Sequence, residues 1–148
     1  MPENLLIESI KLDDFSSKNR TLKSLAEKIS KKYSTNKNEV LHSLMEREMI
    51  CNTGLEKGIA TPHIILSSKI PAKIIITKLN KQVDDWICLD NTKVDLLVCL
   101  ICSKDNVSQE ELKRMKKIYS LLGDELFIEK ITKINNENEI VKIFRNLV

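Results

Sequence analysis

The stretch that decides the fold runs from Arg47 to His63 and reads REMICNTGLEKGIATPH. It follows a helical pattern and ends on a histidine, and it holds two of the chain's three glycines and one of its three prolines. Glycine allows backbone conformations that other residues resist. Pro62 fixes its own φ and donates no hydrogen bond, so it holds the next residue in a defined direction. A histidine presented in this way is positioned for chemistry.

His63 has the properties of a phosphoryl acceptor. Neutral imidazole, with an unperturbed pKa of about 6.5, is a nucleophile near neutral pH and can hold a phosphoryl group as a phosphoramidate. Such transfer depends on positioning and on charge neutralisation. The guanidinium of Arg47 would bind phosphate oxygens, and the Thr53 hydroxyl and the backbone N–H groups near Gly54 and Gly58 are further candidate donors.

Some of these residues also have a purely structural interpretation. Arg47 ends a helical pattern, where a cation is favourable whether or not it binds a ligand. The sequence Asn52-Thr53-Gly54 is also ordinary turn chemistry. The other histidine, His42, flanks the apolar stripe of a helical segment with no glycine or proline near it, so we interpret it as a surface or boundary residue. His63 is therefore the only residue that we expect to be phosphorylated.

A combined pattern is formed by Arg47-Glu48, Asn52-Thr53-Gly54, Gly58-Ile59-Ala60-Thr61-Pro62-His63, Asp85-Trp86, Asp90 and Val94-Asp95-Leu96-Leu97. It resembles the signature of the fructose/mannitol-type (type 2) IIA components of the bacterial phosphoenolpyruvate-dependent sugar phosphotransferase system, and the resemblance covers nearly the whole chain. It implies a phosphotransferase that works through a phosphohistidine intermediate on His63. It also implies two partners, a small histidine phosphocarrier protein as donor and a IIB component of a sugar permease as acceptor, and no metal or organic cofactor.

Two positions depart from the family pattern. Thr61 stands where a branched aliphatic residue is usual. Glu111 stands where the family usually has a second histidine, and an ionised carboxylate there would repel phosphate. Glu111 also has a structural interpretation, because Ser108 followed by a glutamate three residues later is a helix capping box. The sequence leaves both interpretations of Glu111 open.

Two other functions remain open. The chain could be a regulatory IIA-like module whose phosphorylation state controls the binding of partner proteins instead of sugar transport, as in the nitrogen-type relatives of the family, and Glu111 favours this alternative. A third possibility is an anion-binding or scaffold domain that is not phosphorylated, since the fold is shared with a cytoplasmic domain of anion exchangers. The retained histidine motif argues against the third possibility.

Length and composition indicate one domain over residues 1–148, with 30% charged and 42% hydrophobic residues, as in soluble globular proteins. The formal net charge of +3 is small and the charges are mixed, which argues against nucleic acid as a partner. The basic run Lys113–Lys117 is interpreted as the solvated face of a helix. No apolar run is long enough to span a bilayer and no signal peptide is present, so we expect a cytoplasmic protein without membrane insertion.

The four cysteines lack a secreted disulfide context and are interpreted as buried strand residues. Cys99 and Cys102 have the spacing of a redox motif, but they lie in a strand-like run where residues three apart point to opposite faces. With two histidines and no Cys/His cluster, we predict no metal site.

The periodicity predicts helices on both sides of a block of strands. The expected elements begin with a first strand that holds Leu5, Leu6 and Ile7, a helix from about Lys18 to Tyr33, and a second helix that ends near Arg47. Two strands follow at Ala72–Leu79 and Val94–Cys102, with a turn and a short extended piece at Val83–Cys88 between them. Three further helices are expected after Ser108, around Leu126–Ile131 and from Asn136 to Val148. Both faces of such a sheet need cover. We therefore predict a three-layer α/β/α arrangement, of the α+β class, with a mixed central sheet.

Overall fold

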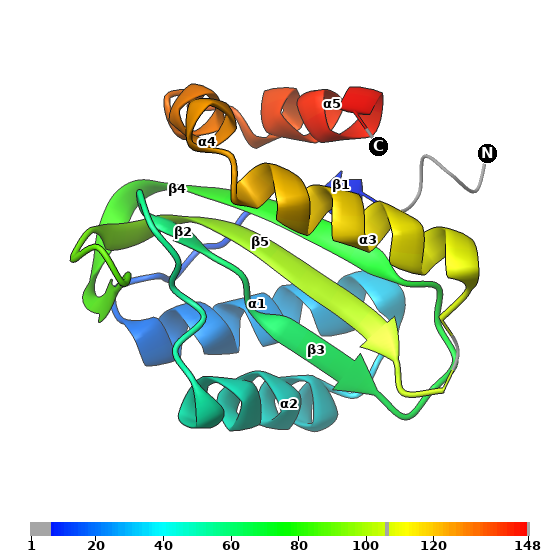
Figure 1. Ribbon diagram of the computed structural model, residues 1–148. Helices are drawn as coiled ribbons and strands as arrows, with labels where there is room; N and C mark the ends of the chain where they lie inside the picture. Colours follow the sequence, from blue (N-terminus) through cyan, green and yellow to red (C-terminus); the bar gives the residue numbers. More distant parts are fainter. Residues whose placement is uncertain (1–6, 106, 148) are drawn as a thin grey trace.

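A computed structural model describes residues 7–105 and 107–147. Figure 1 shows a sheet between two groups of helices. The elements in chain order are β1 (Ile7–Ser9), α1 (Lys18–Tyr33), α2 (Lys37–Ile50), β2 (Ile59–Ala60), β3 (His63–Leu66), β4 (Lys73–Ile87), β5 (Lys93–Ser103), α3 (Gln109–Leu122), α4 (Glu125–Thr132) and α5 (Glu137–Leu147).

The sheet is mixed, as the sequence predicts. The strand order is β1-β4-β5-β2, and β3 also pairs with β5. The two long strands β4 and β5 are antiparallel, whereas β1 is parallel to β4, and β2 and β3 are parallel to β5. The short strands β2 and β3 therefore follow one another along the same side of β5, at the edge of the sheet.

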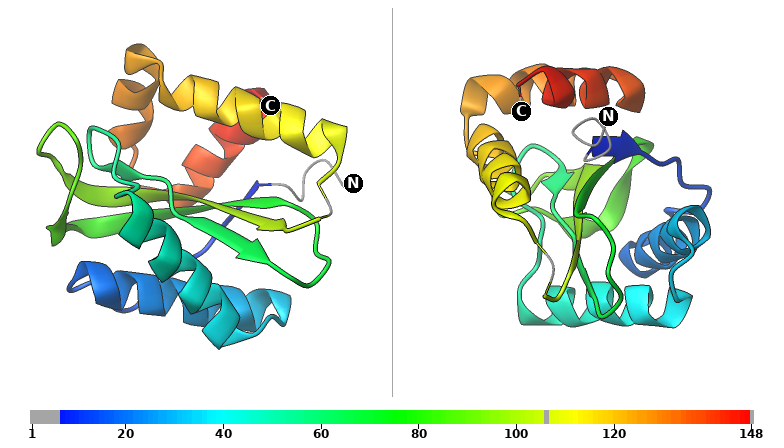
Figure 2. Two further views of the ribbon diagram at one scale, coloured as in Figure 1. Left: turned by 60° about the horizontal axis from the view of Figure 1, so that its bottom comes forward. Right: turned by 90° about the vertical axis from the view of Figure 1, so that its right-hand side faces the viewer.

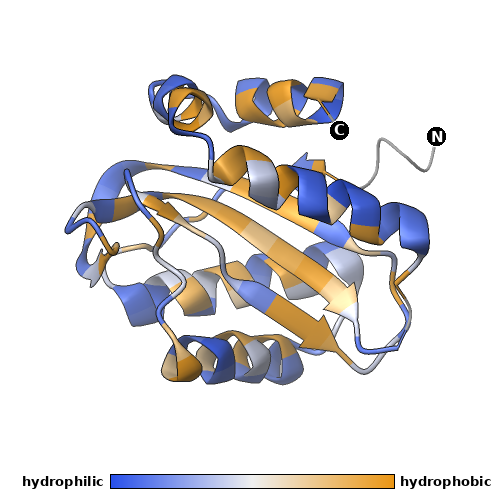
Figure 3. Ribbon diagram, in the orientation of Figure 1, coloured by the Kyte–Doolittle hydropathy of each residue, from blue (hydrophilic) through white to orange (hydrophobic). Residues whose placement is uncertain are grey.

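The two faces of the sheet bury two separate hydrophobic cores, which confirms the three-layer prediction. Alternate residues of β4 point to opposite faces: Ile75 packs with α1 and α2, and Ile74 and Ile76 pack with α3, α4 and α5. Figure 2 shows these two helical layers on either side of the sheet. The strongly apolar β5 is covered on both faces, and Figure 3 shows the hydrophobic residues gathered on the strands.

The helices begin and end close to the predicted residues. The Ser17 side chain caps α1 by accepting from the Arg20 N–H, and Ser34 ends that helix in the left-handed conformation, with φ 54°. The helix α2 continues to Ile50, so Arg47 lies in its last turn. The predicted capping box of Ser108 and Glu111 starts α3, and Gly123 ends it. No helix among the described residues is long and apolar enough to cross a membrane.

Several local predictions are corrected. The turn expected within Val83–Cys88 is not formed, because β4 continues to Ile87 and pairs again with β5 at Val83 and Ile87 after two shifts in register. The short strands β2 and β3 are not among the predicted elements, and His63 begins β3. Cys51 is exposed at the end of α2, unlike the buried strand residues Cys88 and Cys99. The predicted strand residues Leu5 and Leu6 and the predicted helix residue Val148 lie outside the described residues.

Candidate functional site

His63 is the first residue of the edge strand β3. It pairs with Leu100 of β5, whose N–H donates to the Pro62 carbonyl at 2.9 Å. The next residue, Ile64, is buried in the core under α1 and α2, so the alternation of the strand directs His63 and Ile65 to the face that carries α3. Cover on that face is incomplete: Ile65 is 54% exposed and His63 is half-buried. The imidazole is therefore both held and accessible.

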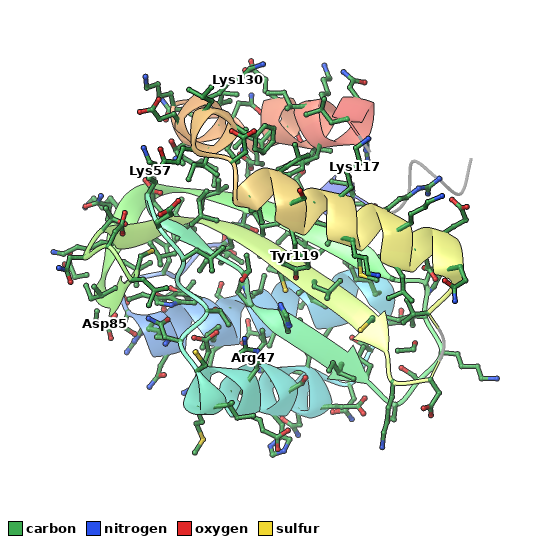
Figure 4. The ribbon with its side chains drawn as sticks, viewed as in Figure 1. Arg47, Lys57, Asp85, Lys117, Tyr119 and Lys130 are labelled. Carbon is green, nitrogen blue, oxygen red and sulfur yellow. The ribbon has the colours of Figure 1, made fainter. Side chains whose placement is uncertain are left out.

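Tyr119 of α3 lies against the imidazole. The Tyr119 hydroxyl is 3.0 Å from Nε2 of His63, and the ring centroids are 6.0 Å apart at an interplanar angle of 55°. Figure 4 shows the Tyr119 side chain extending from α3 over the edge of the sheet. The sequence places Tyr119 on the apolar face of its helix beside Met115 and Leu122, which is why its polar end was not recognised as part of the site.

Arg47 approaches the same edge of the sheet from the last turn of α2. Its Nη1 donates to the Cys51 carbonyl at 2.9 Å, and the side chain is half-buried. Figure 4 shows Arg47 on the α2 side and Tyr119 on the α3 side of β3. The Arg47 charge acts on the imidazole of His63, whose pKa it lowers. The binding of phosphoryl oxygens by Arg47 stays a prediction.

The surroundings keep His63 neutral. Burial lowers the pKa of His63 most, the Arg47 charge lowers it further, and the carboxylate of Glu48 acts in the opposite direction. Burial also raises the pKa of Tyr119, so its hydroxyl keeps its proton. A neutral imidazole beside a neutral hydroxyl and a fixed cation is suited to attack an anionic phosphorus centre.

Glu48 fixes the loop that follows α2. Its carboxylate accepts from the Thr53 N–H at 3.1 Å and from the Thr53 hydroxyl, and it pairs with Lys18 of α1, whose Nζ lies 2.9 Å away. The Glu48 side chain is only 6% exposed, so the Lys18 charge compensates a buried carboxylate. The role of Glu48 beyond the family pattern, and the part that Lys18 plays, cannot be predicted from the sequence, because nothing in it shows that α1 reaches this loop.

Asn52 ties the same loop to the end of β4. Its Oδ1 accepts from the Gly54 N–H at 3.0 Å and from Nε1 of the fully buried Trp86 at 2.9 Å, and its Nδ2 donates to the Ile87 carbonyl at 2.6 Å. Trp86 is therefore a core residue, and it helps to set the shape of the loop.

The predicted phosphate-binding role of Thr53 and Gly54 needs correction. Both donors of Thr53 are bound to Glu48, and the Gly54 N–H is bound to Asn52. The residue Thr53 is 2% exposed. Gly58 is needed for its backbone, with φ 78° and a position where a Cβ would come within 2.6 Å of Asp95 Oδ1, and its N–H donates to Thr92. These residues shape the loop, and their donors are not directed at a ligand.

Glu111 acts in the helix cap. Its Oε1 accepts from the Ser108 N–H at 3.0 Å and its Oε2 from the Ala72 N–H at 2.7 Å. It lies eight residues before Tyr119, which corresponds to about 12 Å along the helix axis. At the position where the family resemblance expects a second histidine, this chain therefore has a structural carboxylate, and the residue that contacts His63 lies two turns further along α3.

The remaining polar candidates lie outside the site. His42 is on the surface, with its side chain 78% exposed and Nε2 at 3.4 Å from Glu46. Among residues 7–105 and 107–147, no group of three or more His, Cys, Asp or Glu side chains is arranged to hold a metal ion.

The chain is similar to proteins of one known family. Residues 3–147 match the family described as phosphoenolpyruvate-dependent sugar phosphotransferase system, EIIA 2. The chain is 30% identical over 118 residues to a nitrogen regulatory protein of Bradyrhizobium diazoefficiens, covering 78% of this chain and 74% of that protein. It is 28% identical over 133 residues to the fructose-specific EIIABC component of Mycoplasma pneumoniae, covering 88% of this chain but 18% of that much longer protein.

A solved structure shows the same fold. The nitrogen regulatory protein IIA-Ntr of Neisseria meningitidis superposes with a TM-score of 0.78 over 97% of this chain and 99% of that one, at 19% sequence identity. The family match over residues 3–147 establishes that the chain belongs to the EIIA 2 family of the phosphoenolpyruvate-dependent sugar phosphotransferase system.

Proposed function

We propose that the protein is a phosphohistidine carrier that accepts a phosphoryl group on His63 from a small histidine phosphocarrier protein and passes it to a IIB component for sugar uptake and phosphorylation. The observation that carries the proposal is the half-buried imidazole of His63, which contacts the Tyr119 hydroxyl and whose pKa is lowered by burial and by the Arg47 charge. Family membership supports the same chemistry.

The transfer needs no cofactor. A lone pair of the His63 ring attacks phosphorus as the bond between phosphorus and the donor nitrogen breaks, and that electron pair returns to the donor. Arg47 offsets the charge of the incoming phosphoryl group, because guanidinium binds phosphate oxygens in a fork. The partial exposure of the ring allows a second protein to reach it and remove the group.

The test is the intact mass of the protein after incubation with phosphoenolpyruvate and the general phosphocarrier proteins. The parent chain should gain one acid-labile phosphoryl group. His63→Ala should gain none, and His42→Ala, which removes the exposed histidine, should behave like the parent. A His63→Ala protein that still accepts phosphate would refute the assignment.

A regulatory role is the second candidate, and the relative named a nitrogen regulatory protein favours it. In that case the phosphorylated and unphosphorylated forms would bind a partner protein with different affinity, and delivery of phosphate to a IIB component would be slow. Mixing the phosphorylated protein with a purified IIB component separates the two roles. Rapid loss of phosphate to IIB supports the carrier role, and retention of the phosphate supports the regulatory role.

A further inference from the structure

The hydrogen bond between Tyr119 and His63 has a direction. Burial raises the pKa of Tyr119, so its oxygen carries a proton, and the pKa of His63 is lowered, so the ring is neutral. A neutral ring has one N–H and one acceptor nitrogen. A hydroxyl can donate or accept, so the direction of the 3.0 Å contact between Tyr119 and Nε2 follows from which ring nitrogen carries the proton.

We propose that the Tyr119 hydroxyl donates to Nε2 of His63, which places the ring proton on Nδ1, that it thereby directs phosphorylation to Nε2, and that it then donates a hydrogen bond to the phosphoryl group held there. In this tautomer the nucleophilic lone pair belongs to the nitrogen that faces α3. The inference rests on the proposed carrier function and adds a residue to it. Tyr119 thereby supplies a hydrogen-bond donor that Glu111, the residue at the expected second-histidine position, does not supply, since both Glu111 oxygens accept bonds from Ser108 and Ala72.

The step balances without a proton transfer by Tyr119. The Nε2–P bond forms as the bond from phosphorus to the donor nitrogen breaks, and the electron pair returns to the donor. The hydroxyl, displaced from the Nε2 lone pair, rotates to a neighbouring phosphoryl oxygen and keeps its proton. A hydrogen bond from a neutral donor to a charged oxygen is stronger than one to a neutral ring nitrogen, so the phosphorylated form gains from the exchange.

Tyr119 also differs from a histidine at such a position. Its proton stays in place throughout the neutral pH range, because burial raises its pKa above the ordinary value of about 10. A histidine donor would change its charge within that range. The hydrogen bond to the phosphoryl group should therefore not vary between about pH 6 and about pH 9.

The experiment compares the parent with Tyr119→Phe, which removes only the hydroxyl. The control is Tyr33→Phe, because Tyr33 also has a half-buried ring and its hydroxyl bonds to Glu8 at 2.5 Å, on another part of the protein. The phosphoryl donors are the general phosphocarrier protein and, separately, potassium phosphoramidate, which needs no docking surface. Melting temperatures are recorded for all three proteins.

Two readouts follow. Nitrogen-15 spectra of the unphosphorylated ring should show the Nδ1–H tautomer in the parent and in Tyr33→Phe, and a mixture of tautomers in Tyr119→Phe. In the parent, phosphorus should be bonded to Nε2, and the half-life of phospho-His63 should fall about tenfold in Tyr119→Phe alone. A loss of fold stability alone would not change the tautomer.

The outcomes separate the inference from the proposed function. Phosphorylation of the parent at Nδ1, or an equal half-life in Tyr119→Phe, overturns the role of Tyr119 and leaves the carrier function standing. Acceptance from phosphoramidate but not from the phosphocarrier protein overturns the carrier function, while the tautomer and the half-life still decide the role of Tyr119. An unchanged tautomer in Tyr119→Phe also overturns the inference.

Discussion

The carboxylate of Glu111 connects α3 to the start of β4, because its Oε2 accepts a hydrogen bond from the Ala72 N–H at 2.7 Å. Its Oε1 accepts from the Ser108 N–H at the same time. A residue with both oxygens engaged in this way holds the helix on the sheet and so helps to place Tyr119 over His63. The interpretation of Glu111 as a capping residue agrees with the structure, and the possibility that it faces His63 does not.

Replacing Glu111 with histidine should therefore weaken the fold without changing the chemistry. The substitution removes two hydrogen bonds to backbone N–H groups, and we expect it to lower the free energy of unfolding by about 1–2 kcal/mol. The half-life of phospho-His63 should stay within a factor of about two of the parent. Chemical denaturation and phosphate release measure the two quantities. Glu110→His, at an exposed position in the same turn, is the control, and a longer phospho-His63 half-life in Glu111→His alone would contradict the prediction.

Arg47 should matter for its fork as well as its charge. Arg47→Lys keeps the cation but loses the paired donors, and we expect transfer from the phosphocarrier protein to slow about tenfold, with Arg47→Ala slower still. Single-turnover transfer rates provide the measurement. The control is Arg20→Lys, which changes an exposed arginine of α1 that pairs with Asp14. This variant should accept phosphate at the parental rate. If Arg47→Lys and Arg47→Ala both transfer at the parental rate, Arg47 serves only to bind the Cys51 carbonyl at the helix end.

The buried imidazole should make stability depend on pH. The pKa of His63 is lowered in the folded protein, whereas the unfolded chain has a value of about 6.5. The unfolded chain therefore binds more protons in mildly acid solution, so the stabilisation by neutral His63 is fully present above about pH 6.5 and is lost as the pH falls toward the folded pKa.

The measurement is the free energy of unfolding of the parent and of His63→Gln from about pH 8 to about pH 5. The parent should lose more stability than the variant over this range, since carboxylates with lowered pKa values titrate at lower pH in both proteins. His42→Gln should leave the parental profile unchanged, because His42 is exposed. Parallel profiles for the parent and His63→Gln would show that the folded environment does not affect the ring.

Substitution of Glu48 should lower both the stability of the protein and the acceptance of phosphate by His63. Glu48→Gln leaves the Lys18 ammonium without its partner and weakens the hold on Thr53, so we expect a loss of about 2 kcal/mol in unfolding free energy, reduced because Lys18 is partly exposed. Phosphoryl acceptance by His63 should fall as well, because the loop between α2 and β2 loses its anchor. The control is Glu46→Gln, because Glu46 lies two residues before Glu48 in α2 and is exposed. This variant should change the free energy of unfolding little. If Glu48→Gln and the parent have equal free energies of unfolding, Glu48 does not stabilise the loop between α2 and β2.

The local features of the fold follow from the sequence because they depend on neighbours along the chain. The apolar spacing of Leu22, Leu25, Ala26 and Ile29 is enough to predict α1 and its buried face, and Ser108 with Glu111 is enough to predict where α3 begins. The continuous apolar run Val94–Cys102 predicts a central strand, because only a strand covered on both faces needs apolar side chains in both directions. The motif ending in Pro62 and His63 identifies the candidate nucleophile.

The tertiary structure alone decided which groups surround that nucleophile. Tyr119 lies 56 residues from His63 in the chain and Lys18 lies 30 residues before Glu48, so no periodicity or local spacing connects them. Thr53 and Gly54 show the same limit, since the sequence lists their donors but not the Glu48 and Asn52 acceptors that already occupy them. The residues next to His63 in the chain are enough to identify it as the candidate nucleophile. Its tautomer, its pKa and its partners depend on the long-range packing that brings α2, α3 and the edge of the sheet together.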